Sequence, residues 1–151
     1  MAIRRILVPI DFSTDSLHAL AYARDLSQSF RSELLLLHVV DQTYLAGAPE
    51  LRLANPALAK LLDDQWRGAN THVAHLAADL ERKGQRSRTL VKRGSPAQVI
   101  ADTARRTGLA HMLIGSVAEK VGRTAACPVL TVRRAAGKRR PHRLGRRPVV
   151  P

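Results

Sequence analysis

Two stretches of the chain are apolar at consecutive positions rather than at alternating ones. They run from Ile6 to Ile10 and from Leu34 to Val40, and His38 is the one polar residue inside the second. Strands that are buried on both faces of a parallel sheet have this continuous pattern. Both stretches are therefore predicted to be central strands, and His38 is interpreted as a hydrogen-bonded side chain of the core.

Helical periodicity follows each of these strands. Ser13 or Thr14 is placed to cap a helix with apolar residues at helical spacing up to about Phe30. A longer helix is predicted from Asn55-Pro56 to Gly84, because a capping side chain precedes a proline that suits the first helical turn. The order strand, helix, strand, helix predicts a right-handed βαβ arrangement.

The second half of the chain repeats the alternation. Ser95-Pro96 with Gln98 forms a capping box that opens a helix to about Arg106. The other predicted elements are strands at 87–92, 110–114 and 128–132 and a helix at 117–125. Five parallel strands alternating with four helices predict an α/β fold, a doubly wound sheet with helices on both faces.

The composition fits a single domain. The distribution of charge indicates a basic tail after it. The chain has 151 residues, of which 45% are hydrophobic, and a formal net charge of +13. Eight cations and no acidic residue lie between Arg133 and Arg147; without them 17 cations face 12 anions, or +5. The expected organisation is a domain at 1–134 and a disordered basic tail at 135–151.

The chain has a single cysteine, Cys127, which cannot form a disulfide within the chain. A lone thiol fits a reducing compartment, so a cytoplasmic location is expected. The apolar stretch at 6–10 is too short for a signal sequence, and no stretch approaches the ~20 apolar residues of a membrane helix. Neither secretion nor a membrane span is therefore expected.

Several motifs, in order, resemble the universal stress protein family. They read Ile6-Leu-Val-Pro-Ile-Asp-Phe-Ser13, Leu36-Leu-His-Val-Val-Asp41, Gly94-Ser-Pro, Gly115-Ser-Val-Ala-Glu-Lys-Val121 and Cys127-Pro-Val-Leu-Thr-Val-Arg133. The resemblance covers residues 2–134. It implies a five-stranded sheet of order 3-2-1-4-5, of the adenine-nucleotide α-hydrolase type, and a homodimer that pairs through the strand around Val129–Arg133.

The chain departs from the ATP-binding branch of that family at the phosphate loop. That branch has a glycine, two residues, a second glycine, nine residues, and then Gly-Ser or Gly-Thr. Counting back from Gly115 puts Asp102 and Arg105 where the two earlier glycines belong. Either the fourth strand is missing or, in the interpretation we prefer, the strand ends at Gly115-Ser116 and the loop is deleted. Without those glycines, backbone N–H groups cannot close around phosphate oxygens.

The resemblance leaves half of a nucleotide site. Pro9, Asp11 and Val39 would line the base and ribose, and Gly115, Ser116 and Val117 would meet one phosphate at a helix N-terminus. Asp11 and Gly115-Ser116 also have ordinary structural interpretations: Asp11 can be a cap for the helix that follows, and Gly115-Ser116 can be a strand-to-helix turn with a serine cap. Half a site predicts weak ATP binding or none.

No residue pattern predicts catalysis or a metal site. His72 and His75 lie three residues apart on the long helix, but a third ligand at a matching spacing is missing. Cys127, which precedes a proline at a strand start, is interpreted as a packing residue. The chain contains neither a P-loop motif nor a dinucleotide-binding glycine motif.

The first hypothesis is a cytoplasmic, non-catalytic universal stress protein that dimerises and has degenerate or absent ATP binding. One alternative is an ATP-binding sensor, in which Asp11→Ala should weaken binding. Another is an accessory protein that contacts nucleic acid or an anionic surface through the basic tail. A last alternative, a decaying copy with a marginal fold, predicts a broad thermal transition.

Overall fold

A computed structural model describes residues 3–43, 50, 54–107, 111–114 and 129–131. The predicted helix at 117–125 and the tail at 135–151 lie outside these residues, as do Gly115, Ser116 and Val117. The elements are, in order, β1 (Arg5–Pro9), α1 (Thr14–Phe30), β2 (Glu33–Asp41), α3 (Pro56–Arg82), β3 (Ser87–Gly94), α4 (Pro96–Arg106), β4 (His111–Ile114) and β5 (Val129–Thr131). The predicted alternation of strands and helices is thus present from β1 to β4, and the segment between β4 and β5 lies outside the described residues.

The strands form one sheet in the order β3-β2-β1-β4-β5, and every neighbouring pair is parallel. The predicted α/β fold with a parallel sheet is therefore confirmed. β4 pairs with β1, Ile6 opposite His111, so the fourth strand is present and ends one residue before Gly115. This finding favours the interpretation in which the loop after the strand, and not the strand itself, has been lost.

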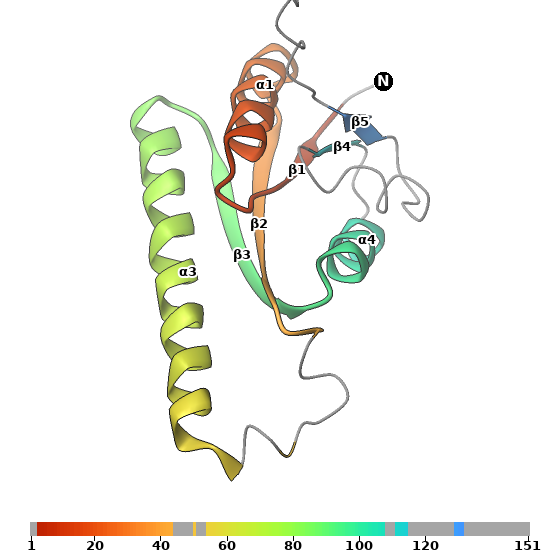
Figure 1. Cartoon of the computed structure of the whole chain (residues 1–151). Coiled ribbons are helices and arrows are strands. Elements are labelled where there is room, and N and C mark those ends of the chain that lie inside the picture. The colour runs from red at the N-terminus through yellow and green to blue at the C-terminus, as the bar shows by residue number, and fades with distance from the viewer. Residues whose placement is uncertain (1–2, 44–49, 51–53, 108–110, 115–128, 132–151) are drawn as a thin grey trace, which may run out of the picture.

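Helices cover both faces of the sheet (Figure 1). α1 and α3 pack on one face, where Leu20 and Val73 join a buried cluster with Val8 and Leu36. α4 packs on the other face, where Ile100 joins Leu7 and Leu37 in a second cluster. Because successive strand residues point to opposite faces, a strand between two helical layers must be apolar at every position.

Two helices begin with the side-chain capping hydrogen bond that the sequence predicts. A third helix begins without one. The side chain of Ser13 accepts a hydrogen bond from the Ser16 N–H, and Asn55 accepts one from the Leu58 N–H. Ser95 is the N-cap of α4, but its side chain makes no capping hydrogen bond. The predicted capping box at Ser95 is therefore wrong in its side-chain part, and the proline at the first helical position remains as the start signal.

Candidate functional site

The strand order of the sheet reverses between β1 and β4, so the carboxyl ends of these two strands form the topological switch point. The chain passes from β1 to β2 on one side, and β4 joins β1 on the other. Open α/β sheets hold ligands outside the strand ends at such a switch point. Pro9 is buried at the end of β1, Val39 is half-buried near the end of β2, and Asp11 is exposed just beyond β1.

Asp11 shapes the turn between β1 and α1. Its Oδ1 accepts hydrogen bonds from the Ser13 N–H, at 2.9 Å, and from the Ser13 hydroxyl. The same Ser13 hydroxyl caps α1, so the carboxylate holds the capping residue in place. The interpretation of Asp11 as the cap of this helix is wrong, because Ser13 is the N-cap and Asp11 holds Ser13 in place. The Asp11 carboxylate is exposed just beyond the carboxyl end of β1.

Phe12 takes a strained backbone conformation between these two residues. Its φ is 63°, in the left-handed region that a residue with a bulky side chain rarely occupies. The turn places the Phe12 ring 4.9 Å from the His38 ring and 5.4 Å from the His72 ring, centroid to centroid. The strain therefore serves to insert an aromatic ring between β2 and α3.

His38 is held by the backbone of the neighbouring strand. Its Nδ1 lies 2.7 Å from the carbonyl oxygen of Ile10, which has no proton to give, so Nδ1 is the donor. The predicted hydrogen bond of His38 is confirmed, but the side chain is half-buried and not in the core. The bond fixes the tautomer and leaves Nε2 as the acceptor when the ring is neutral.

An open cavity of about 450 Å³ lies beside this aromatic cluster. Nine residues from the β1 end, the β2 end and α3 line it: Phe12, His38, Val39, Val40, Asp41, Gln65, Gly68, Ala69 and His72. Of the predicted site residues the cavity includes Val39 but neither Pro9 nor Asp11. The sequence did not single out Phe12, Asp41 or Gln65 as site residues, although Asp41 follows β2 much as Asp11 follows β1.

Asp41 repeats the hydrogen-bonding pattern of Asp11. Its Oδ1 accepts from the Thr43 N–H at 2.9 Å and from the Thr43 hydroxyl at 2.7 Å. These bonds, the backbone one first, lower the pKa of Asp41, and slight burial opposes them. The ligand edge thus carries two carboxylates that can accept hydrogen bonds from hydroxyl or amino groups but would repel phosphate.

Metal and membrane features are not found in the described part of the chain. No group of three or more His, Cys, Asp or Glu side chains is arranged there to hold a metal ion. Within the same residues, no helix has both the length and the apolar content needed to cross a membrane. Gly115, Ser116 and Val117, expected at the phosphate end of the site, lie outside the described residues and stay predictions.

Comparison with known proteins gives consistent matches. The model of the universal stress protein family matches residues 2–133. A universal stress protein of Methanocaldococcus jannaschii is 31% identical over 144 residues, covering 87% of this chain and 82% of the relative. The structure of a universal stress protein from Lactobacillus plantarum superposes with a TM-score of 0.76 at 22% identity, over 88% of this chain and 99% of that one.

A further solved structure has a nucleotide in it. It is a universal stress protein family protein from Arabidopsis thaliana with AMP bound, at 20% identity and a TM-score of 0.61, and it covers 88% of this chain and 93% of that one. At such identities the two solved structures show a shared fold.

Proposed function

Because the chain belongs to the universal stress protein family, we propose that it is a non-catalytic, cytoplasmic stress-response protein whose nucleotide site has lost its phosphate loop. The proposal keeps the fold of the adenine-nucleotide α-hydrolase type and a nucleoside half-site at the ends of β1 and β2. ATP binds to this site weakly at most.

The length of the β4–β5 connection carries this proposal. β4 ends at Ile114 and β5 begins at Val129, so 128 − 115 + 1 = 14 residues join them. The two strands are parallel, and a parallel pair needs a crossover of a dozen or more residues, usually with a helix. A crossover between the two parallel strands therefore takes up the whole connection between β4 and β5. A glycine loop with spacers of two and nine residues does not fit in addition.

The nucleoside half of the site has support of its own. Pro9 and Val39 lie near the ends of adjacent paired strands, and Asp11 is exposed beside them. The Arabidopsis relative binds AMP, a nucleotide with a single phosphate. A site without the glycine loop should therefore discriminate little between AMP and ATP, since the β- and γ-phosphates would find no cradle of backbone N–H groups.

A titration calorimetry experiment tests the proposal. Mg-ATP and AMP are titrated into the full chain in 0.3 M salt, which screens attraction to the basic tail. We expect no saturable heat below millimolar ATP, and equal or tighter binding of AMP. Micromolar binding of ATP that Asp11→Ala weakens, and the control Asp15→Ala does not, would instead identify an ATP sensor.

The proposed homodimer uses the β5 edge of the sheet. β5 is the last strand of the described sheet on that side, and Leu130 is 49% exposed. An unpaired edge with an exposed apolar side chain favours pairing with a second copy around Val129–Arg133. Sedimentation velocity should show a dimer, and Leu130→Asp should give a monomer, whereas Leu61→Asp, at a similarly exposed position on α3, should leave the dimer intact.

A further inference from the structure

The end of the sheet at which the strands begin, opposite the nucleotide half-site, is basic. We call this end the amino edge. There β2 and β3 begin, and α1 and α3 end (Figure 1). Six cations of this edge, which we call the amino-edge patch, are exposed: Arg4, Arg5, Arg31, Lys83, Arg86 and Arg88. Two nearby carboxylates, Glu33 and Glu81, oppose them, so the patch has a net charge of 6 − 2 = +4.

Hydrogen bonds tie the members of the patch to one another. The Glu33 N–H donates to the Arg4 carbonyl at 2.9 Å, and a guanidinium N–H of Arg86 donates to the Arg31 carbonyl at 3.3 Å. The Arg88 Nε donates to Glu33 at 2.8 Å. The cations therefore come from neighbouring segments that meet at one edge, although they are up to 84 positions apart in the sequence.

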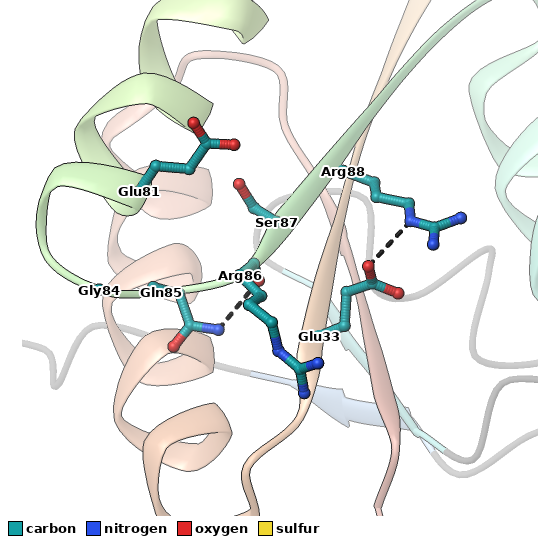
Figure 2. Close-up of a pocket in the computed structure, with 7 residues that line it drawn as sticks. All are labelled: Glu33, Glu81, Gly84, Gln85, Arg86, Ser87 and Arg88. Atoms are coloured by element: carbon teal, nitrogen blue, oxygen red, sulfur yellow. Dashed lines mark hydrogen bonds and ion pairs between the residues drawn. The ribbon is translucent and has the colours of Figure 1, made fainter.

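An open cavity of about 410 Å³ lies within the patch (Figure 2). The side chains of Arg86, Ser87 and Arg88 line it at the start of β3, with Gln85 and Glu81 on the α3 side. The Ser87 hydroxyl is buried and has no hydrogen-bond partner among the described residues. The Ser87 side chain points toward Glu81, whereas Arg86 and Arg88, its neighbours along the chain, point away from it (Figure 2).

Helix dipoles account for only part of this charge. Arg31 and Lys83 follow the C-termini of α1 and α3, where cations are stabilised by the helix dipole. Arg5, Arg86 and Arg88 lie at strand starts, where no such dipole acts. Among the described residues, only Arg88 of these three has an ion-pair partner, Glu33. The excess of arginine favours phosphate, which its planar guanidinium binds in a bidentate manner.

An exposed aromatic ring adds a second kind of contact. Phe30 ends α1 directly before Arg31 and is 47% exposed. Cations that follow a phosphate backbone together with an exposed ring for base stacking are the features of single-stranded nucleic-acid binding. We propose that the amino-edge patch binds single-stranded nucleic acid, with Lys83 and Arg86 on phosphates and Phe30 stacked on a base.

Fluorescence anisotropy with a labelled 20-nucleotide single-stranded RNA tests the proposal on the full chain. The patch variant combines Lys83→Ser with Arg86→Ser, and the control combines Lys60→Ser with Arg67→Ser on the other half of α3. All four side chains are exposed, so both variants should fold. Both remove one lysine and one arginine and leave the basic tail unchanged.

The salt dependence separates the patch from the tail. Each phosphate contact to a single strand contributes about 0.7 to the slope of log K against log salt, so losing two contacts should reduce the slope by about 1.4. At 0.1 M salt this corresponds to about 25-fold weaker binding. A patch variant that changes the slope no more than the control would overturn the proposal and leave the tail as the binding segment.

Stacking is tested separately on α1. Phe30→Leu should weaken single-strand binding about fivefold or more, whereas Tyr22→Leu, at a 58% exposed position of the same helix, should change it less than about twofold. Equal binding of a duplex and no effect of Phe30→Leu would overturn the single-strand assignment. Binding to phosphatidylserine vesicles that depends on Lys83 and Arg86, without binding to RNA, would do the same.

Discussion

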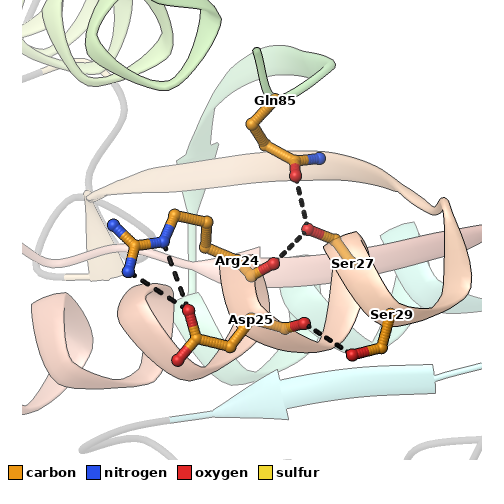
Figure 3. A network of polar contacts seen from close by, with 5 residues as sticks. All are labelled: Arg24, Asp25, Ser27, Ser29 and Gln85. Atoms are coloured by element: carbon orange, nitrogen blue, oxygen red, sulfur yellow. Dashed lines mark hydrogen bonds and ion pairs between the residues drawn. The ribbon is translucent and has the colours of Figure 1, made fainter. Parts of the chain in front are cut away.

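Replacing Gln85 should test whether the hydrogen bonds of this one buried side chain hold α1 to the start of β3. Gln85 is 5% exposed, and its Oε1 accepts a hydrogen bond from the Ser27 hydroxyl at 2.7 Å (Figure 3). Its Nε2 donates to the Ser32 carbonyl at 3.2 Å and to the Arg86 carbonyl at 3.0 Å. One side chain thus joins the end of α1, the start of β2 and the start of β3.

The cost of Gln85→Met follows from counting these bonds. Methionine has nearly the same length but neither donates nor accepts strongly. The Ser27 hydroxyl has one proton and keeps the Arg24 carbonyl, 2.6 Å away, as its acceptor, so its loss is small. The Ser32 carbonyl loses a donor, at about 1 kcal/mol, whereas the Arg86 carbonyl keeps the Leu34 N–H, 3.1 Å away, as its donor. We expect the free energy of unfolding to fall by about 1 kcal/mol.

Urea denaturation followed by circular dichroism measures this change. Gln28→Met, at an exposed position of α1, is the matched control and should change stability by less than about 0.5 kcal/mol. Ser27→Ala should cost about 1 kcal/mol, and a double mutant with Gln85→Met should cost less than the sum. A cost for Gln85→Met no larger than that of the Gln28→Met control would refute the idea that the Gln85 side chain holds these segments together.

Three further changes are predicted from local geometry. Arg31 follows α1 with a φ of 55°, so Arg31→Gly should relieve left-handed strain and raise stability by about 0.5–1 kcal/mol, seen as a higher Tm. Asn55→Ala removes the cap on the Leu58 N–H and should cost about 1 kcal/mol in urea denaturation. The hydrogen bonds of Thr43 lower the pKa of Asp41 from its ordinary value of 3.8, so the ionised group stabilises the fold above that pH and loses this effect as pH falls through the lowered pKa. Because Asp41 is exposed, Asp41→Asn should change the acid side of the stability curve by less than about 0.5 kcal/mol.

The strands and helix starts could be predicted because their signals are local. Continuous apolar residues give β1 and β2, and the sequence Asn55-Pro56 gives the start of α3. Ser95 shows the limit of such signals. The sequence supplies a capping residue there, but the side chain makes no capping bond, and whether a serine rotamer reaches the helix N–H groups depends on packing that the sequence pattern does not show.

The cavity near Phe12 could not be predicted for a different reason. It requires a left-handed φ at a phenylalanine, where sequence rules favour glycine or asparagine. It also requires α3 to lie beside the end of β2, so that His72 meets the Phe12 ring. Pro9, Asp11 and Val39 could be assigned to the sheet edge from their positions after strands, but the shape of the space around them depends on residues far away in the sequence.

The two proposed sites lie at opposite ends of the sheet, which makes their tests independent. β2 spans Glu33 at the amino edge to Asp41 at the ligand edge, eight steps of roughly 3.3 Å, or about 26 Å. This separation is about three Debye lengths at physiological salt, so charges at one edge act little on ligands at the other. Lys83→Ser with Arg86→Ser should therefore leave AMP binding unchanged, and Asp11→Ala should leave RNA binding unchanged. If either variant affected both ligands, one shared anion site would explain the data better than two separate edges.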